Sequence, residues 1–157
     1  MTYQFTDLMH AFGSALGLPE PEKLANSTPF SVNDIVFCFR KPGAESDQLL
    51  MLFVDFGPIP KGNEAAVYYQ LLRENYLEFP TKNASYCVSS CTGNVVYARA
   101  VALEAMTVGT LIEVVAKLVE QVRYWRLDHA DGRLQIAPQP MRRPAFVLPL
   151  QLKASAL

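Results

Sequence analysis

The spacing of apolar residues predicts three amphipathic helices. The first covers about residues 5–16, where Phe5, Leu8, Met9, Phe12 and Leu16 recur at intervals of three and four before Gly17. The second begins after Asn63, whose side-chain oxygen is expected to cap it, and ends near Glu78 because Pro80 blocks continuation. The third, over 108–125, keeps the helical period for five turns and is the clearest of the three.

Strands are predicted between these helices. Residues 19–31, with three prolines, indicate a loop that leads to a strand beginning near Asn33. Residues 49–56 are apolar on both faces, as is typical of a central strand, and 86–90 and 95–103 flank a glycine-bearing turn. The order α-β-β-α-β-β-α predicts an α+β fold, with a twisted and mainly antiparallel sheet packed with helices.

Length and charge indicate one domain followed by a tail. The chain has 157 residues, and the predicted elements end near residue 128. Residues 1–128 carry 10 basic and 14 acidic groups, a net charge of −4, whereas 129–157 carry 4 and 1, a net charge of +3. The tail also holds four prolines, so we expect a flexible segment or an extended one laid on its own or another body.

Composition argues against several classes of protein. The 14 basic and 15 acidic residues give no clustered positive charge for nucleic acid. The longest apolar run, Leu49 to Val54, is far shorter than the roughly 20 residues of a membrane span. Residues 1–22 contain no Lys or Arg, unlike a signal peptide. We therefore expect a cytoplasmic protein that binds neither nucleic acid nor membrane.

Strong catalytic and cofactor motifs are missing. The sequence has no glycine-rich phosphate loop, no Gly-x-Ser-x-Gly elbow, no His-Glu-x-x-His and no Cys-x-x-Cys. A zinc site would need Cys87 and Cys91 with His10 or His129, and a Cys-His nucleophile lacks a third orienting group. Buried thiols and exposed imidazoles explain these residues more simply, and an outward position explains Asp55. We expect no enzyme, no metal and no cofactor.

Residues of the second and third helices resemble a known family. Leu71-Leu72-Arg73-Glu74-Asn75, the following hairpin and the long helix ending at Trp125 look like the class I type III secretion chaperones of the Tir chaperone family, over about residues 3–128. The resemblance implies a homodimer that binds the N-terminal chaperone-binding segment of an effector in extended form. That binding keeps the effector soluble and competent for secretion, and the secretion ATPase is a further candidate partner.

The resemblance also implies two surfaces. An effector-binding groove would be formed by helix one and the sheet, with these residues: Phe5, Leu8, Met9, Phe12, Phe37, Phe39, Leu50, Leu52 and Val54. A dimer interface would lie on helix two and the neighbouring strand, with these residues: Tyr68, Leu71, Leu72, Asn75, Tyr76, Tyr97 and Val101. Plain core remains the alternative for each residue. The two parities of the strands compete for burial, so one sheet face should need a partner.

Two other functional classes stay open at this point. The chain could be a small α/β interaction or regulatory domain unrelated to secretion, which docks a permanent partner on its sheet. It could also be a small enzyme with a site that no motif reveals. A co-purifying partner that is unfolded when alone would favour the chaperone over both.

Overall fold

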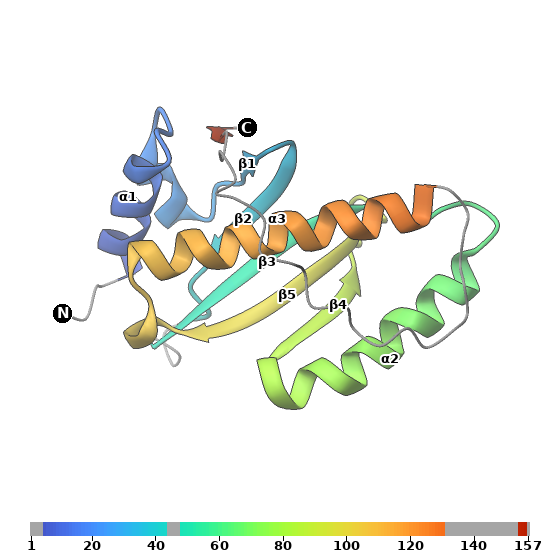
Figure 1. Ribbon diagram of the computed structural model, residues 1–157. Coiled ribbons are helices and arrows are strands. Elements are labelled where there is room, and N and C mark those ends of the chain that lie inside the picture. The colour runs from blue at the N-terminus through green and yellow to red at the C-terminus, as the bar shows by residue number, and fades with distance from the viewer. Residues whose placement is uncertain (1–4, 44–47, 131–153, 157) are drawn as a thin grey trace.

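The computed structural model describes residues 5–43, 48–130 and 154–156, and it confirms the α+β class. Helices α1 (Phe5–Ala15), α2 (Glu64–Lys82) and α3 (Val108–Ala130) pack against one antiparallel sheet. Figure 1 shows α3 crossing the sheet lengthwise, α1 at the end that holds β1 and β2, and α2 beside β4 at the other end. Two short 3-10 turns, Pro21–Asn26 and Leu103–Ala105, complete the helical elements of the described residues.

The sheet has the strand order β4-β5-β3-β2-β1-β6, and every neighbouring pair is antiparallel. The bounds are β1 Phe30–Val32, β2 Ile35–Arg40, β3 Leu49–Gly57, β4 Ala84–Val88, β5 Val95–Ala102 and β6 Ala154–Ala156. The long pairing of β3 with β5 joins the two halves of the domain, because β3 precedes α2 in the chain and β5 follows it. The central position predicted for residues 49–56 is confirmed.

Only one face of the sheet is buried beneath helices. Residues of one parity, such as Phe37, Leu52 and Val54, are completely buried in a core that also contains the apolar stripes of α1 and α3. Residues of the other parity, such as Met51 and Phe53, are half-buried. Because alternate side chains of a strand point to opposite faces, this difference shows that the helices cover one side.

The structure adds two strands to the predicted order. The segment 19–31, expected to be a loop, contains a 3-10 turn and then β1. A tight turn at Asn33 and Asp34, both with positive φ, joins β1 to β2. β6 lies inside the predicted tail, of which residues 131–153 and 157 are outside the described part. Strands of three residues are too short to show an alternating pattern in the sequence.

The second helix is longer than predicted. It continues past Pro80 to Lys82, and Asn83 ends it in a left-handed conformation. The proline lies in the last turn, where the carbonyl that loses its N–H partner belongs to exposed Tyr76 and is open to water. At the other end, the side chain of Asn63 makes no capping hydrogen bond, contrary to the sequence prediction. Its main-chain oxygen instead accepts the N–H of Val67.

The C-terminal half of α3 is tied to the end of β3. Arg126 Nε donates to the carbonyl oxygen of Phe56 at 3.0 Å, beside a β-bulge between Asp55 and Gly57. Gly57 has a φ of 108°, which only glycine adopts easily. The Asp55 carboxylate accepts hydrogen bonds from the Gly57 N–H and the Asn94 side chain, so its role is to hold this bulge.

We predict that Phe12→Ala lowers the free energy of unfolding by about 3–5 kcal/mol, because it removes a completely buried ring. The ring of Phe12 makes edge contacts with those of Phe30 and Phe39. His10→Ala, an exposed position on the same helix, should change the free energy by less than ~0.5 kcal/mol. Urea unfolding followed by circular dichroism measures both. Equal effects would contradict the packing described here.

Candidate functional site

The nine residues of the predicted groove lie together, but they lie in the core of the single chain. None of them is more than 6% exposed, and eight of the nine have no exposed surface at all. As an open groove in the single chain, this set is therefore wrong. The sheet residues among them face the helices, and the residues of α1 are the stripe that α1 turns toward the sheet.

Aromatic packing explains why α1 closes over this end of the sheet. Phe12 lies between Phe30 and Phe39, with ring centroids 5.8 Å and 5.3 Å away, and Phe30 stacks on Phe37. Edge-to-face contacts of this kind add stability beyond the burial of apolar area. Four rings from α1, β1 and β2 thus form one cluster, which keeps the short strand β1 in place.

The predicted dimer residues separate into two groups. Leu71, Tyr97 and Val101 are at most 8% exposed, so they belong to the core of the single chain. Tyr68, Leu72 and Tyr76 are 43%, 68% and 83% exposed. The spacing of four residues places these three on one stripe, away from the side of α2 that faces the sheet.

The exposed surface of α2 is more apolar than the prediction included. It contains these six large apolar side chains: Tyr68, Tyr69, Leu72, Tyr76, Leu77 and Phe79. We call this set the α2 stripe. Tyr69, Leu77 and Phe79 were not in the predicted interface, although all three are apolar positions on a helix with few buried residues. Those buried residues are Val67, Leu71 and Glu78. The helix has more large apolar residues than its narrow buried side can hold, and this pattern in the sequence could have indicated the exposed ones.

Asn75, the last residue of the Leu-Leu-x-x-Asn motif, binds the outer edge of the sheet. Its side-chain N–H donates to the carbonyl oxygen of Tyr86 at 3.0 Å, and its side-chain oxygen accepts the N–H of Tyr86 at 2.6 Å. The amide thereby imitates a paired strand residue, with one donor and one acceptor. Since β4 ends the sheet order on this side, α2 closes that edge at Tyr86.

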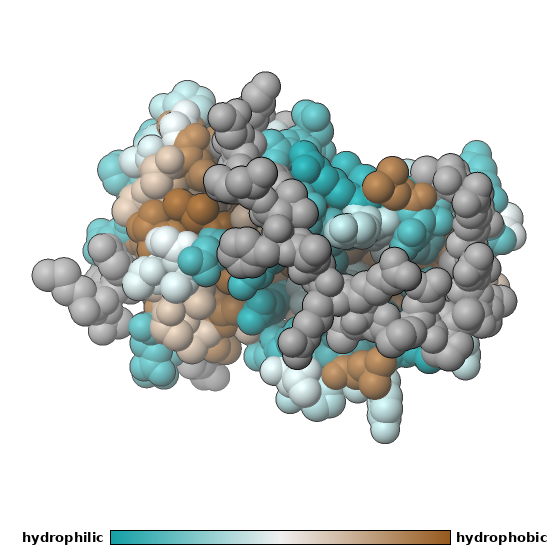
Figure 2. All heavy atoms as spheres, in the orientation of Figure 1, coloured by the Kyte–Doolittle hydropathy of each residue, from teal (hydrophilic) through white to brown (hydrophobic). Residues whose placement is uncertain are grey.

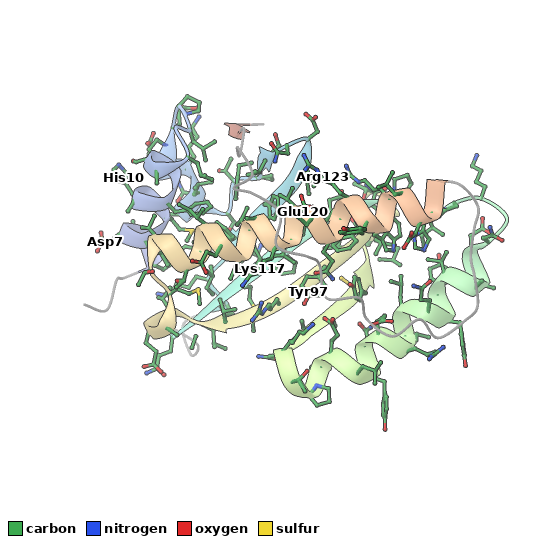
Figure 3. The ribbon with its side chains drawn as sticks, in the orientation of Figure 1. Asp7, His10, Tyr97, Lys117, Glu120 and Arg123 are labelled. Carbon is green, nitrogen blue, oxygen red and sulfur yellow. The ribbon has the colours of Figure 1, made fainter. Side chains whose placement is uncertain are left out.

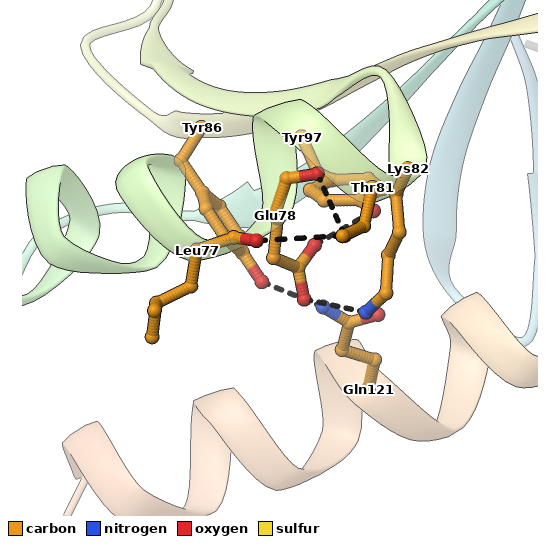
Figure 4. Close-up of polar contacts among 7 residues, drawn as sticks. All are labelled: Leu77, Glu78, Thr81, Lys82, Tyr86, Tyr97 and Gln121. Carbon is orange, nitrogen blue, oxygen red and sulfur yellow. Dashed lines mark hydrogen bonds and ion pairs between the residues drawn. The ribbon is translucent and has the colours of Figure 1, made fainter.

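Polar contacts beneath α2 tie this helix to β5, and a further hydrogen bond ties α3 to β4. Both oxygens of the Glu78 carboxylate are used: Lys82 Nζ lies 2.7 Å from one, and the Tyr97 hydroxyl donates to the other at 3.1 Å (Figure 4). Gln121 Nε2 of α3 donates to the Tyr86 hydroxyl at 2.6 Å. Burial, followed by the nearby negative charge of Glu78, raises the pKa of both tyrosines, so both hydroxyls stay protonated. The Tyr97 hydroxyl donates to Glu78, whereas the Tyr86 hydroxyl accepts from Gln121.

The opposite edge of the sheet is organised differently. β1 ends the run of four strands β5-β3-β2-β1, and β6 pairs with its outer side. Figure 2 shows apolar surface gathered over α1 and the first turns of α3, next to this end of the sheet. Half-buried apolar residues of these elements and the turn between β5 and α3 are Leu16, Met106, Val108, Ile112 and Val114. A strand edge therefore lies close to an apolar surface.

Several titratable residues of the described part lie on the outer sides of α1 and α3. Figure 3 shows Asp7 and His10 pointing away from the sheet on α1, and Lys117, Glu120 and Arg123 on the outer side of α3. Cys87 and Cys91 are exposed and unpaired, and burial raises the pKa of the Cys38 thiol. Among residues 5–43, 48–130 and 154–156, no group of three potential metal ligands comes together. No helix in those same ranges is long and apolar enough to span a membrane.

Comparison with known proteins gives a family match and structural matches. Residues 7–126 match the Tir chaperone protein (CesT) family. The crystal structure of the ExsC-ExsE complex contains a chain with a TM-score of 0.63 and 16% sequence identity, over 82% of this chain and 96% of that one. At this identity, the structural match shows a common fold. No curated protein sequence matches the chain.

We predict that Asn75→Ala lowers the free energy of unfolding by about 1–3 kcal/mol, because the peptide group of Tyr86 loses both of its side-chain partners. Asn75→Asp keeps an acceptor for the Tyr86 N–H but loses the donor, and should fall between Ala and the wild type. Gln70→Ala, on an exposed position of the same helix, is the control. Urea midpoints for the three variants test this order, and an unchanged Asn75→Ala would refute the role of the amide.

Proposed function

Because the chain belongs to the Tir chaperone (CesT) family, we propose that it binds the N-terminal segment of a secreted effector in extended form and keeps that effector competent for type III secretion. One observation carries this proposal. α2 closes the sheet at β4, whereas at the other end β1 accepts an antiparallel strand on its outer side. An edge of this kind is suited to adding a strand from a partner.

Strand addition matches the physical requirements of such a partner. Main-chain hydrogen bonds recognise an extended segment of any sequence, and each contributes about 0.5–1.5 kcal/mol in net terms. An unfolded segment also loses conformational entropy when it binds, so a few such bonds alone give weak affinity. Apolar side chains of the partner must supply the rest. The apolar surface over α1 and the start of α3 lies where those side chains would reach (Figure 2).

The buried groove residues have an indirect part in this proposal. The aromatic cluster of Phe12, Phe30, Phe37 and Phe39 holds β1 against α1. It therefore keeps the outer edge of β1 at a fixed position relative to the apolar surface over α1. Because this surface is already ordered before binding, the chain loses less conformational entropy when a partner binds.

The protein acts as a homodimer in this proposal, and the α2 stripe forms the interface. Six exposed large apolar side chains on one helix exceed what a solvated helix normally shows. The stripe lies at the β4 end of the sheet, so a dimer formed there leaves both β1 edges accessible (Figure 1). A two-fold interface buries the same patch of both chains.

The proposed function is tested by partner capture. The tagged chain is purified from its own bacterium, and bound proteins are identified by mass spectrometry. We expect a protein whose N-terminal segment is required for capture and is protected from proteolysis in the complex. Ser31→Pro should weaken this complex by about tenfold or more, because it removes a main-chain donor of β1, whereas His10→Ala should not. Capture that needs only a folded domain of the partner would exclude the proposal.

Dimer formation is expected to depend on the α2 stripe. The wild type should sediment as a dimer at micromolar concentration, with an interface on the order of 1,600 Å² in total. Leu72→Asp and Tyr76→Asp should give folded monomers, since both side chains are exposed in the single chain. Gln70→Asp adds the same charge outside the stripe and should remain dimeric. A wild type that is monomeric at micromolar concentration would rule out this interface.

A further inference from the structure

We infer that β6 is a built-in competitor for the edge of β1 that receives the partner. β6 consists of Ala154–Ala156 and runs antiparallel to β1, with Ser155 opposite Ser31. Figure 1 shows it beside β1 at the outer end of the sheet. The chain thus places its own last strand on the edge that, in the proposed function, an effector strand would occupy. The competition rests on that function, whereas the occupancy of the edge does not.

The turn between β1 and β2 shows which main-chain groups are involved. Asn33 and Asp34 have φ values of 51° and 65°, the signature of a two-residue type I′ turn. Such a turn makes Val32 and Ile35 a hydrogen-bonded pair. Because hydrogen-bonded and non-hydrogen-bonded pairs alternate along an antiparallel ladder, Phe30 and Phe37 are also a hydrogen-bonded pair, and Ser31 and Val36 between them are not. The N–H and C=O of Ser31 consequently point away from β2, toward Ser155 of β6.

The same alternation distinguishes the residues of β6. Ser155, opposite Ser31, turns its N–H toward β1, and its neighbours Ala154 and Ala156 turn theirs away. A proline at 155 therefore removes a donor from the ladder. A proline at 156 removes an N–H that faces outward, which edge strands tolerate.

The composition of β6 suits a cover that can be displaced. Ala-Ser-Ala is only three residues long, and alanine is depleted in strands because it has little side chain to pack. Its attachment to the same chain compensates, since pairing within one molecule does not depend on the concentration of a second one. A partner strand with larger apolar side chains would replace it. Until then β6 pairs an edge that would otherwise promote aggregation.

The effect on partner affinity follows from occupancy. If β6 covers the edge in most molecules, the apparent Kd for the partner equals the Kd for the uncovered edge divided by the fraction of molecules in which the edge is uncovered. An edge that is free in about one molecule in ten would weaken partner binding about tenfold. Releasing β6 should therefore tighten binding, in contrast to Ser31→Pro, which damages the accepting strand itself.

Hydrogen exchange on the full-length protein tests the occupancy without any partner. Exchange at the main-chain amide of Ser31 is compared in the wild type, Ser155→Pro and Ala156→Pro. We expect about tenfold faster exchange in Ser155→Pro and wild-type exchange in Ala156→Pro. A synthetic peptide of residues 150–157, added at millimolar concentration, should slow exchange in Ser155→Pro and leave the wild type unchanged. Identical exchange in all three proteins would overturn the inference.

Partner binding then tests the competition. With the effector segment found by capture as the probe, Ser155→Pro should bind about three- to tenfold more tightly than the wild type, and Ala156→Pro should bind equally. Faster exchange in Ser155→Pro with equal affinity in all three would overturn the competition and leave the proposed function intact. Failure of all three proteins to bind any unfolded segment would overturn the proposed function, and the competition with it.

Discussion

Every open β-sheet has two edges with unpaired main-chain groups, and the way this chain treats its two edges organises the rest of the molecule. At β4 the edge is closed from within by α2, whose Asn75 amide pairs with both main-chain groups of Tyr86. At β1 the edge is left able to pair, and β6 pairs with it. Unpaired edges lead to aggregation or to partner binding, so this asymmetry separates the edge closed by α2 from the edge proposed to bind a partner.

The position of α2 beside β4 depends on a buried carboxylate beneath the helix. Glu78 brings a carboxylate beneath α2, where Lys82 and the Tyr97 hydroxyl satisfy its two oxygens. Glu78 and Lys82 belong to α2, Lys82 being its last residue, and Tyr97 belongs to β5. The hydrogen bond from Tyr97 to Glu78 helps to fix the rotation of α2 against the sheet, and in that orientation Leu72 and Tyr76 face outward. The stripe proposed for dimerisation follows from the same contacts that seal the edge.

Burial in the single chain changes the meaning of the residues that the family resemblance singled out. Phe37, Phe39 and Leu52 alternate along their strands with an apolar set of nearly equal size, so the sequence allowed either face to be covered. The structure buries the first set completely beneath α1 and α3. These residues hold β1, the edge proposed to bind a partner, through packing, and the accessible apolar surface lies on the outer side of the same helices.

Elements that extend over several turns or several alternations could be predicted from the amino-acid sequence alone. Helices α1 and α3, the central strand β3 and the hairpin of β4 and β5 all follow from periodicities that neighbouring residues share. The Leu-Leu-x-x-Asn motif, together with the order of elements, the hairpin and the long helix ending at Trp125, also predicted the family, which the match over residues 7–126 confirms. Only the tertiary structure decided which parity of β2 and β3 faces the helices, which side of α2 is exposed, and that β1 and β6 are strands at all. The physical reason is that these choices depend on partners distant in the chain: a three-residue strand has no period of its own, and Ser31 and Ser155 become neighbours only when the sheet has formed.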